Sequence, residues 1–252
     1  FDESLGGRVS RLVDWSASGE ATVAAAVREV LGATRAEMGD ADAIALAMDP
    51  GKNALLGESL NLTTMGKLTR ALHHAHYTFR RKISHAADSQ DQRHRMTPGS
   101  RPVLAAHVDG EPDVVVPELL HHCDEARRVF DDCNAATWEA IGKLRALGVD
   151  AERANYLLPN AVAVRFTESS DLLNLFHKHR MRLCYNAQEE IWRASLDEAT
   201  QVRDAHPLLG RYLLPPCALR AMAKAKPICP EGPRYCGVIV WKKDVSEYER
   251  VI

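Results

Sequence analysis

Apolar residues recur at intervals of three and four through the middle of the chain. This spacing matches the α-helical repeat and predicts one long amphipathic helix that ends at Gly148. The positions in the series are Leu119, Leu120, Cys123, Ala126, Val129, Phe130, Cys133, Thr137, Ile141, Leu144 and Leu147. Because Cys123 and Cys133 fall on its apolar face, we expect both to be reduced thiols in the core.

Several other segments have helical patterns bounded by glycine or proline. Gly32, the pair Pro50 and Gly51, and Pro207 are expected to terminate three of them. A fourth is expected to stop before Pro159. The predicted helices span residues 18–32, 38–53, 150–158, 171–182 and 187–205.

Two segments have strand patterns. Residues 76–84, which end a segment (63–79) that begins as a helix, place Tyr77, Phe79 and Ile83 in loose alternation. Residues 160–170 also alternate and predict a second strand. Ser169 or Ser170 is expected to cap the helix that follows. Residues 101–117 are predicted to be loop with short extended pieces, and the Pro-rich tail (213–244) to contain a short strand at 237–241. Together these elements predict one α+β domain spanning residues 1–252.

Composition limits the kinds of partner. Of 252 residues, 46% are apolar, which allows a substantial core. The formal net charge of −2 is unlike that of a general binder of nucleic acid polymers or membranes. No apolar run is long enough to cross a bilayer, and residues 1–15 lack the basic-then-apolar order of a secretory signal. Six cysteines in a chain of this size do not suggest a disulfide scaffold, so we expect a cytoplasmic protein.

The sequence predicts no metal site and no cysteine nucleophile. Glycine-rich nucleotide loops of the Rossmann and P-loop types are absent, as is H-E-x-x-H. Neither histidine cluster (73–76 and 121–122) has metal-ligand spacing with a carboxylate base. Cys217, Cys229 and Cys236 are further apart than the C-x₂₋₄-C pairs of structural zinc sites, which favours packed thiols over zinc. Cys217 also lacks the following histidine of the cysteine-dependent thymidylate synthases.

A basic segment at residues 89–102 (SQDQRHRMTPGSRP) is the strongest candidate for chemistry. It places Arg93, His94, Arg95 and Arg101 within nine positions, beside turn-forming residues. The planar fork of arginine suits bidentate recognition of phosphate, although a solvated face is the alternative. A second basic cluster, HKHRMRLCYNAQ at residues 177–188, follows a predicted helix in the other half of the chain. We expect the two clusters to meet around one phosphate-bearing ligand.

Five sequence elements occur in a defined order between about residues 60 and 237: HHAHYTF, SHAADSQDQRHR, NYLLPN, RLCYNAQEEIWR and CPEGPRYCG. This series resembles the flavin-dependent thymidylate synthase family, whose signature is R-H-R. The resemblance implies an α+β fold with an antiparallel sheet flanked by helices. It also implies a homotetramer in which FAD binds between subunits and each active site draws on several chains. The implied reaction is NADPH-driven transfer of the one-carbon unit of methylenetetrahydrofolate to C5 of a uridine nucleotide, without a cysteine nucleophile.

Matching positions one by one gives the residue roles that the resemblance implies. The implied catalytic residues are Arg93 and Arg182. The implied flavin-binding residues are His74, Arg93, His94, Arg95, Asn174 and Asn186. The implied substrate-binding residues are Gln90, Arg93, Ser100, Arg101 and Arg182. Such guanidinium groups suit an electron-rich flavin and the charge that develops on the uracil carbonyl oxygens.

The chain departs from the family pattern on the nucleotide and folate sides. The loop after Arg95 is shortened, so that Val103 stands where a serine is expected, and Asn155 stands in place of an arginine. Residues 68–70 replace the H-x-[ST] element. We therefore favour UMP over dUMP as substrate, as in homologues that methylate UMP for polyoxin-type nucleoside antibiotics. The alternatives are housekeeping synthesis of dTMP from dUMP and a catalytically inactive nucleotide-binding homologue. An RNA-binding module is disfavoured by the net charge and by the lack of interleaved aromatic residues.

Overall fold

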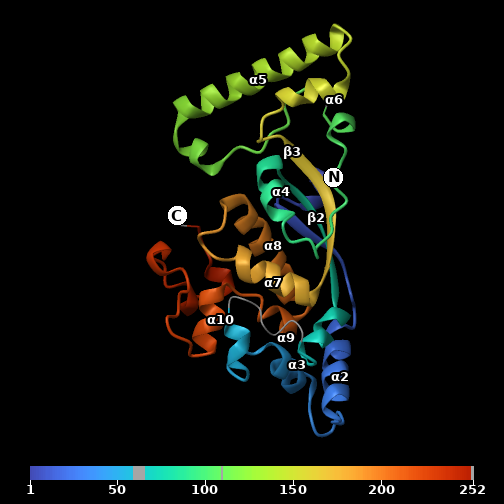
Figure 1. Cartoon of the computed structure of the whole chain (residues 1–252), viewed down its shortest axis with the longest axis vertical. Coiled ribbons are helices and arrows are strands. Elements are labelled where there is room, and N and C mark those ends of the chain that lie inside the picture. The colour runs from blue at the N-terminus through green and yellow to red at the C-terminus, as the bar shows by residue number, and fades with distance from the viewer. Residues whose placement is uncertain (59–65, 109, 251–252) are drawn as a thin grey trace.

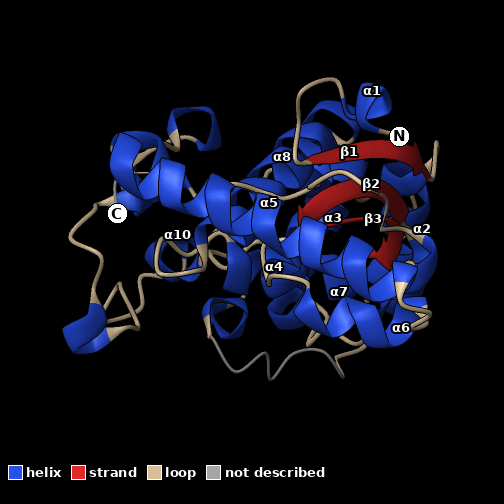
Figure 2. Cartoon of the chain, turned by 90° about the horizontal axis from the view of Figure 1, so that it is seen from above, coloured by secondary structure: helices blue, strands red, loops and turns tan. Residues whose placement is uncertain are grey.

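Three antiparallel strands form one sheet in the order β1 (Ser10–Trp15), β2 (His76–Ser84) and β3 (Ala163–Asp171). The computed structural model describes residues 1–58, 66–108 and 110–250. Figure 2 shows β2 in the middle of the sheet. The antiparallel sheet and its flanking helices agree with the α+β class that the sequence predicts.

Helices lie beside the sheet and at both of its ends (Figure 1). Helix α8 packs against β1 and β2, and α7 contacts β3. Helices α2 and α3 lie at one end of the molecule, and α5 at the other. The helices are α1 (Asp2–Leu5), α2 (Gly19–Leu31), α3 (Asp40–Met48), α4 (His85–Asp91), α5 (Asp124–Ala146), α6 (Ala151–Ala154), α7 (Leu172–Arg182), α8 (Glu189–Ala205), α9 (Pro207–Gly210) and α10 (Pro216–Met222).

Most of the predicted elements are confirmed. Strand β2 has the predicted bounds, β3 overlaps its predicted segment and ends one residue beyond it, and helices α2, α3, α6 and α8 lie within their predicted segments. Of the segment predicted to begin as a helix, residues 63–65 lie outside the described residues. Residues Thr69–His74 form a 3₁₀ helix, η2. Among the described residues, no helix is both long and apolar enough to cross a membrane.

The start of α7 differs from the prediction. Strand β3 continues through Ser169 and Ser170 to Asp171, so neither serine caps the helix. Asp171 is the N-cap instead, and its Oδ1 accepts a hydrogen bond of 2.9 Å from the backbone N–H of Asn174. An aspartate carboxylate is as good a cap as a serine hydroxyl, and its charge also complements the helix dipole.

The tail is also different from the prediction. Residues 237–241 form no strand, and Val240–Lys242 is a short 3₁₀ helix. Helix α10 and the edge strand β1 are present although no sequence pattern indicated them. In β1 only Ser10 is buried, so the strand lacks the apolar alternation by which a half-buried strand is recognised.

The predicted long helix is present, but the prediction of its surroundings is wrong. It begins at Asp124, after a 3₁₀ turn at Glu118–His122. Cys123 and Cys133 are exposed, which contradicts their predicted place in the core. The apolar stripe is present, but the described residues cover it only in part: Ile141 is buried, whereas Val129 remains 58% exposed.

A cluster of buried charges joins the sheet to three helices. Arg81 of β2 and Lys178 of α7 lie among Asp91 of α4, Glu168 of β3 and Glu198 of α8, and all five side chains are at most 1% exposed. Arg81 lies 3.2 Å from Glu168 and from Glu198, and Lys178 lies 3.3 Å from Asp91. Burial alone would raise the pKa of Asp91, but the two cations lower it below its usual value. The cluster therefore holds Asp91 ionised without contact with water.

Replacing Lys178 with methionine is expected to lower the free energy of unfolding by about 3–5 kcal/mol, because three buried carboxylates would then share one fewer cation. Urea denaturation followed by circular dichroism measures the loss. The matched control is Lys143→Met, which breaks an exposed pair with Glu139 on α5 (N–O distance 2.6 Å). Exposed pairs contribute at most about 1 kcal/mol, so equal losses in the two variants would contradict the structural role of the cluster.

Candidate active site

A cleft of about 560 Å³ opens where the C-terminal end of α7 meets the end of α4 and the tail. Three of the sequence-predicted residues line it: Gln90, Arg182 and Asn186. The other lining residues are Met181, Cys184, Tyr185, Ala187, Glu231, Arg234 and Arg250. Segments that are far apart in the sequence thus supply its walls.

Arg182 connects the two basic clusters. Its Nε donates to Nε2 of His94 at 2.9 Å, and an Nη donates to the backbone carbonyl of Gln90 at 3.1 Å. Both acceptors belong to the basic segment, while Arg182 belongs to the last turn of α7. The structure therefore confirms that the two clusters meet, and it attaches the R-H-R segment to α7.

His94 is half-buried and neutral at pH 7. Burial and the adjacent charge of Arg182 lower the pKa of His94 to about 4. Since Nε2 accepts the hydrogen bond from Arg182, the ring proton resides on Nδ1. The ring of His177 packs edge-on against His94, with centroids 5.8 Å apart. Burial also lowers the pKa of His177, so the site has two uncharged imidazoles next to a fixed cation.

Arg93 and Arg95 flank His94 and remain exposed. Within the described part of the chain, neither side chain has a hydrogen bond or an ion pair, in contrast to the carboxylate-paired arginines elsewhere. Their guanidinium groups are free to bind an anionic ligand. An exposed, unpaired guanidinium is suited to bidentate recognition of phosphate.

The second half of the basic segment faces the protein instead. Pro98 and Ser100 exchange backbone hydrogen bonds with β3, through Ser169 (3.1 Å) and Thr167 (2.8 Å) respectively. Arg101 donates from Nε to both carboxylate oxygens of Asp88, at 2.8 and 3.0 Å. Its guanidinium also lies 4.7 Å from the ring centroid of Phe166. Arg101 is thus engaged within its own chain, and Ser100 is exposed beside it.

Close packing explains why the residue before Ser100 is a glycine, Gly99. A Cβ atom on Gly99 would lie 2.9 Å from a ring carbon of Phe166 and 2.7 Å from an Nη of Arg101. The backbone can approach β3 only because no side chain is present at this position.

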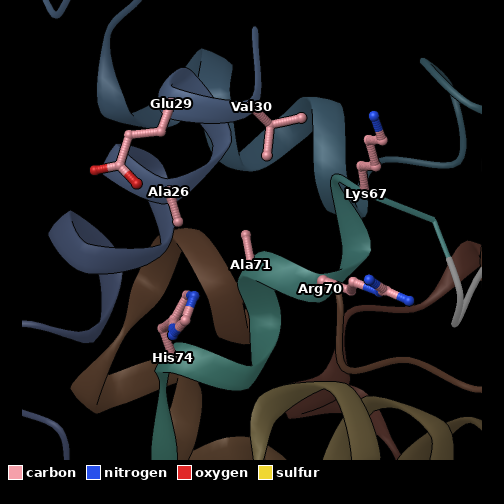
Figure 3. A pocket seen from close by; sticks show the side chains of 7 residues that line it. All are labelled: Ala26, Glu29, Val30, Lys67, Arg70, Ala71 and His74. Carbon is pink, nitrogen blue, oxygen red and sulfur yellow. The ribbon is translucent and has the colours of Figure 1, made fainter.

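His74 and Asn174 are separated from this cleft. His74 lines a second cleft of about 480 Å³ between α2 and η2. Figure 3 shows His74 and Ala71 below Ala26 of α2, with Lys67 at the rim. Asn174 bonds to Asp171 at the N-terminal end of α7. Eight residues, or about 12 Å of helix, separate it from Arg182. Within one chain these predicted flavin ligands therefore do not join the others.

The structure adds residues that the sequence did not single out. His177 lies within the basic cluster at residues 177–188, and only its position next to His94 distinguishes it. Glu231 and Arg234 line the cleft and belong to the CPEGPRYCG element of the tail, and the Nδ2 of Asn186 donates to the Arg234 carbonyl at 2.6 Å. Such long-range contacts leave no periodic pattern by which they can be predicted.

The family model described as "Thymidylate synthase complementing protein" matches residues 11–208. The chain belongs to the flavin-dependent thymidylate synthase family. This confirms the resemblance found in the sequence, and the family is one of methyltransferase-type enzymes. The tail after residue 208, which carries the C-P-E-G motif, lies outside the matched segment.

Two relatives illustrate the similarity. The flavin-dependent thymidylate synthase of Geobacter sulfurreducens is 32% identical over 170 residues, which cover 66% of this chain and 70% of that protein. The flavin-dependent thymidylate synthase of Sulfurisphaera tokodaii is 29% identical over 151 residues. That match covers 59% of this chain and 58% of the relative, so the chain spans less than two thirds of the second protein.

The contact between Arg182 and His94 predicts a specific titration. Replacing Arg182 with glutamine removes a neighbouring positive charge and is expected to raise the pKa of His94 from about 4 toward 6.5. Histidine NMR signals followed against pH measure this change. Because the folded pKa lies below the unfolded value, the unfolded chain binds the proton first. The contribution of His94 to stability is therefore full above about pH 6.5 and falls as the pH is lowered toward 4. An unchanged pKa in Arg182→Gln would show that the two side chains do not interact.

Proposed function

We propose that this chain catalyses FAD-dependent reductive C5-methylation of a uridine monophosphate, with methylenetetrahydrofolate and NADPH as co-substrates. Family membership supports the reaction class. The observation that carries the proposal is the position of Arg182, which bonds to His94 and Gln90 beside the unpaired Arg93 and Arg95. Arg182 lines the cleft and the charge of Arg93 lies close enough to act on it, and guanidinium groups suit ligands that carry phosphate groups.

In this proposal the chain's own residues bind and orient the nucleotide and FAD. Arg93 and Arg95 hold phosphate oxygens of the nucleotide and of FAD, since no carboxylate of the described chain neutralises them. Arg182 uses two N–H groups on His94 and Gln90, and its remaining N–H groups face a uracil carbonyl oxygen on which charge develops. The Gln90 and Asn186 amides line the same cleft and add neutral hydrogen bonds. Bound FAD would supply the hydride equivalents for the reduction.

His94 positions Arg182 in the proposed site. A protonated imidazole would repel the guanidinium, whereas the neutral ring accepts a hydrogen bond from it. Burial keeps the ring neutral at the pH of the reaction, so the orientation of Arg182 is maintained without loss of its charge.

UMP is the proposed substrate rather than dUMP. The segment that departs from the family pattern is also the one that packs along β3, where Asp88 engages Arg101 and Ser100 is exposed. A ribose 2′-hydroxyl needs a polar partner. The segment after Arg95, which departs from the family pattern, offers one in Ser100. We expect kcat/KM for UMP to exceed that for dUMP by at least about tenfold, or about 1.4 kcal/mol. Separate assays of the two nucleotides with methylenetetrahydrofolate and NADPH measure the ratio. A preference for dUMP would instead support synthesis of dTMP.

We also propose that the chain, as a single domain, forms a homotetramer in the cytoplasm with active sites shared between subunits. The separation of His74 and Asn174 from Arg182 within one chain supports shared sites. The exposed part of the apolar stripe, with Val129 of α5 and Leu147 just after it, supports contact with another copy. The six cysteines are free thiols, in keeping with a reducing compartment.

A catalytically inactive, nucleotide-binding homologue is the second candidate. One observation favours it: Arg101, expected to bind substrate, pairs with Asp88 instead. Nucleotide binding without release of tritium from C5-labelled UMP or dUMP would support this alternative.

Arg93→Ala is expected to abolish binding of flavin or nucleotide and to lower turnover by at least about 100-fold, since a charge-assisted phosphate contact contributes about 3 kcal/mol. Flavin absorbance of the purified protein and isothermal titration with UMP measure the two losses. The control is Arg35→Ala, which removes an exposed arginine on the surface connection before α3. Full turnover in Arg93→Ala would refute the assignment of this residue.

Shared active sites predict complementation between inactive variants. His74→Ala and Arg93→Ala homotetramers are each expected to be inactive. Mixed tetramers should regain activity, because some sites would combine an intact His74 from one chain with an intact Arg93 from another. Co-expression with two affinity tags isolates the mixed species for assay. Mixed tetramers that remain inactive would place both residues in a site built by one chain.

A further inference from the structure

Four cysteines that the proposed reaction does not use meet in the structure. Cys184 follows α7, Cys217 lies in α10, and Cys229 and Cys236 lie in the tail. All four line one enclosed cavity. The remaining two cysteines are exposed on or next to α5, so the convergence is specific to this set.

The cavity has the size of a single ion. Its free volume is about 10 Å³, close to the minimum for one water molecule. Apart from the four thiols, its lining consists of three prolines, two tyrosines, Val240, Asn186 and Glu231. An organic ligand does not fit in so small a volume.

The four thiols line the same cavity, and coordination to a divalent cation deprotonates a thiol, so the set can supply four thiolate ligands.

The C-terminal tail after α10 has little regular secondary structure and a small apolar core to stabilise it. After α10, the described residues to 250 contain only 3₁₀ helices of three residues each, and they lie beyond the segment that the family model matches. The small apolar cluster there combines Tyr185 and Trp192 with Val240, Val245 and Tyr248 of the tail. Segments with so little buried area are commonly stabilised by a structural metal.

We propose that Cys184, Cys217, Cys229 and Cys236 bind one Zn²⁺ ion in a tetrahedral four-thiolate site that fastens the tail to the connection between α7 and α8. Four thiols lose their protons to solvent, and the ion and four thiolates form a centre of net charge −2. As the side chains stand, no group of three or more His, Cys, Asp or Glu among the described residues is placed to hold a metal. The sulfurs must therefore close onto the ion, to the Zn–S distance of about 2.3 Å.

The proposed metal site adjoins the candidate active site. Cys184 and Glu231 line both the thiol cavity and the larger cleft. Zinc would thus fix one wall of the cleft and the position of Arg234, whose carbonyl bonds to Asn186. The inference does not depend on the proposed reaction, because a structural ion would be present whether or not the chain is catalytically active.

Metal analysis of the purified full-length protein tests the proposal. Mass spectrometry of the metals is expected to find about one zinc per chain. Replacement of zinc by Co²⁺ should give the sulfur-to-cobalt charge-transfer bands and the strong visible absorption of a tetrahedral thiolate site. Cys217→Ser and Cys229→Ser should each lose the metal and these bands. Cys133→Ser, on the exposed face of α5, is the matched control and should retain both.

The outcomes separate the possibilities. Protein that holds no zinc after incubation with Zn²⁺ and shows no cobalt–thiolate bands would overturn the proposal. Retention of one metal per chain by Cys217→Ser and Cys229→Ser would overturn it as well. If these variants do not fold, the zinc content and cobalt spectrum of the unmodified protein decide. Failure of UMP or dUMP methylation with one zinc retained would count against the proposed function alone.

Discussion

The buried charge cluster is the constraint on which the rest of the structure depends. Arg81 and Lys178 hold three carboxylates that come from three other elements, away from water. Such a cluster adds less to stability than apolar packing of the same volume would, but removing one member is costly. Its arrangement therefore fixes how β2, β3, α4, α7 and α8 are placed relative to one another.

The candidate active site is built directly on this cluster. Asp91 ends α4 immediately before the R-H-R segment, and Lys178 lies one helical turn before Arg182 on α7. Pairing of Lys178 with Asp91 at 3.3 Å thus brings Arg182 within hydrogen-bonding distance of His94 and Gln90. Charges that are satisfied inside the cluster leave Arg93 and Arg95, just outside it, available for ligands.

The cleft is lined by residues from two parts of the chain, one inside and one outside the segment that the family model matches. Gln90, Arg182 and Asn186 lie in the segment that the family model matches, whereas Glu231 and Arg234 come from the tail beyond it. On the nucleotide side, Arg101 is engaged with Asp88. The contact between Arg182 and His94 lies within the matched segment.

The sequence by itself determined the elements whose side chains repeat with a local period, and the motif order that indicates the family. Residues 76–84 and the R-H-R segment are examples. Arg81 and Glu168 fall on the buried alternation of their strands. Only the tertiary structure decided that these charges pair, that Asp88 engages Arg101, that part of the apolar face of α5 stays exposed and that four distant cysteines line one cavity. Each of these depends on contacts between residues far apart in the chain, and local periodicity carries no information about which distant partner a side chain meets.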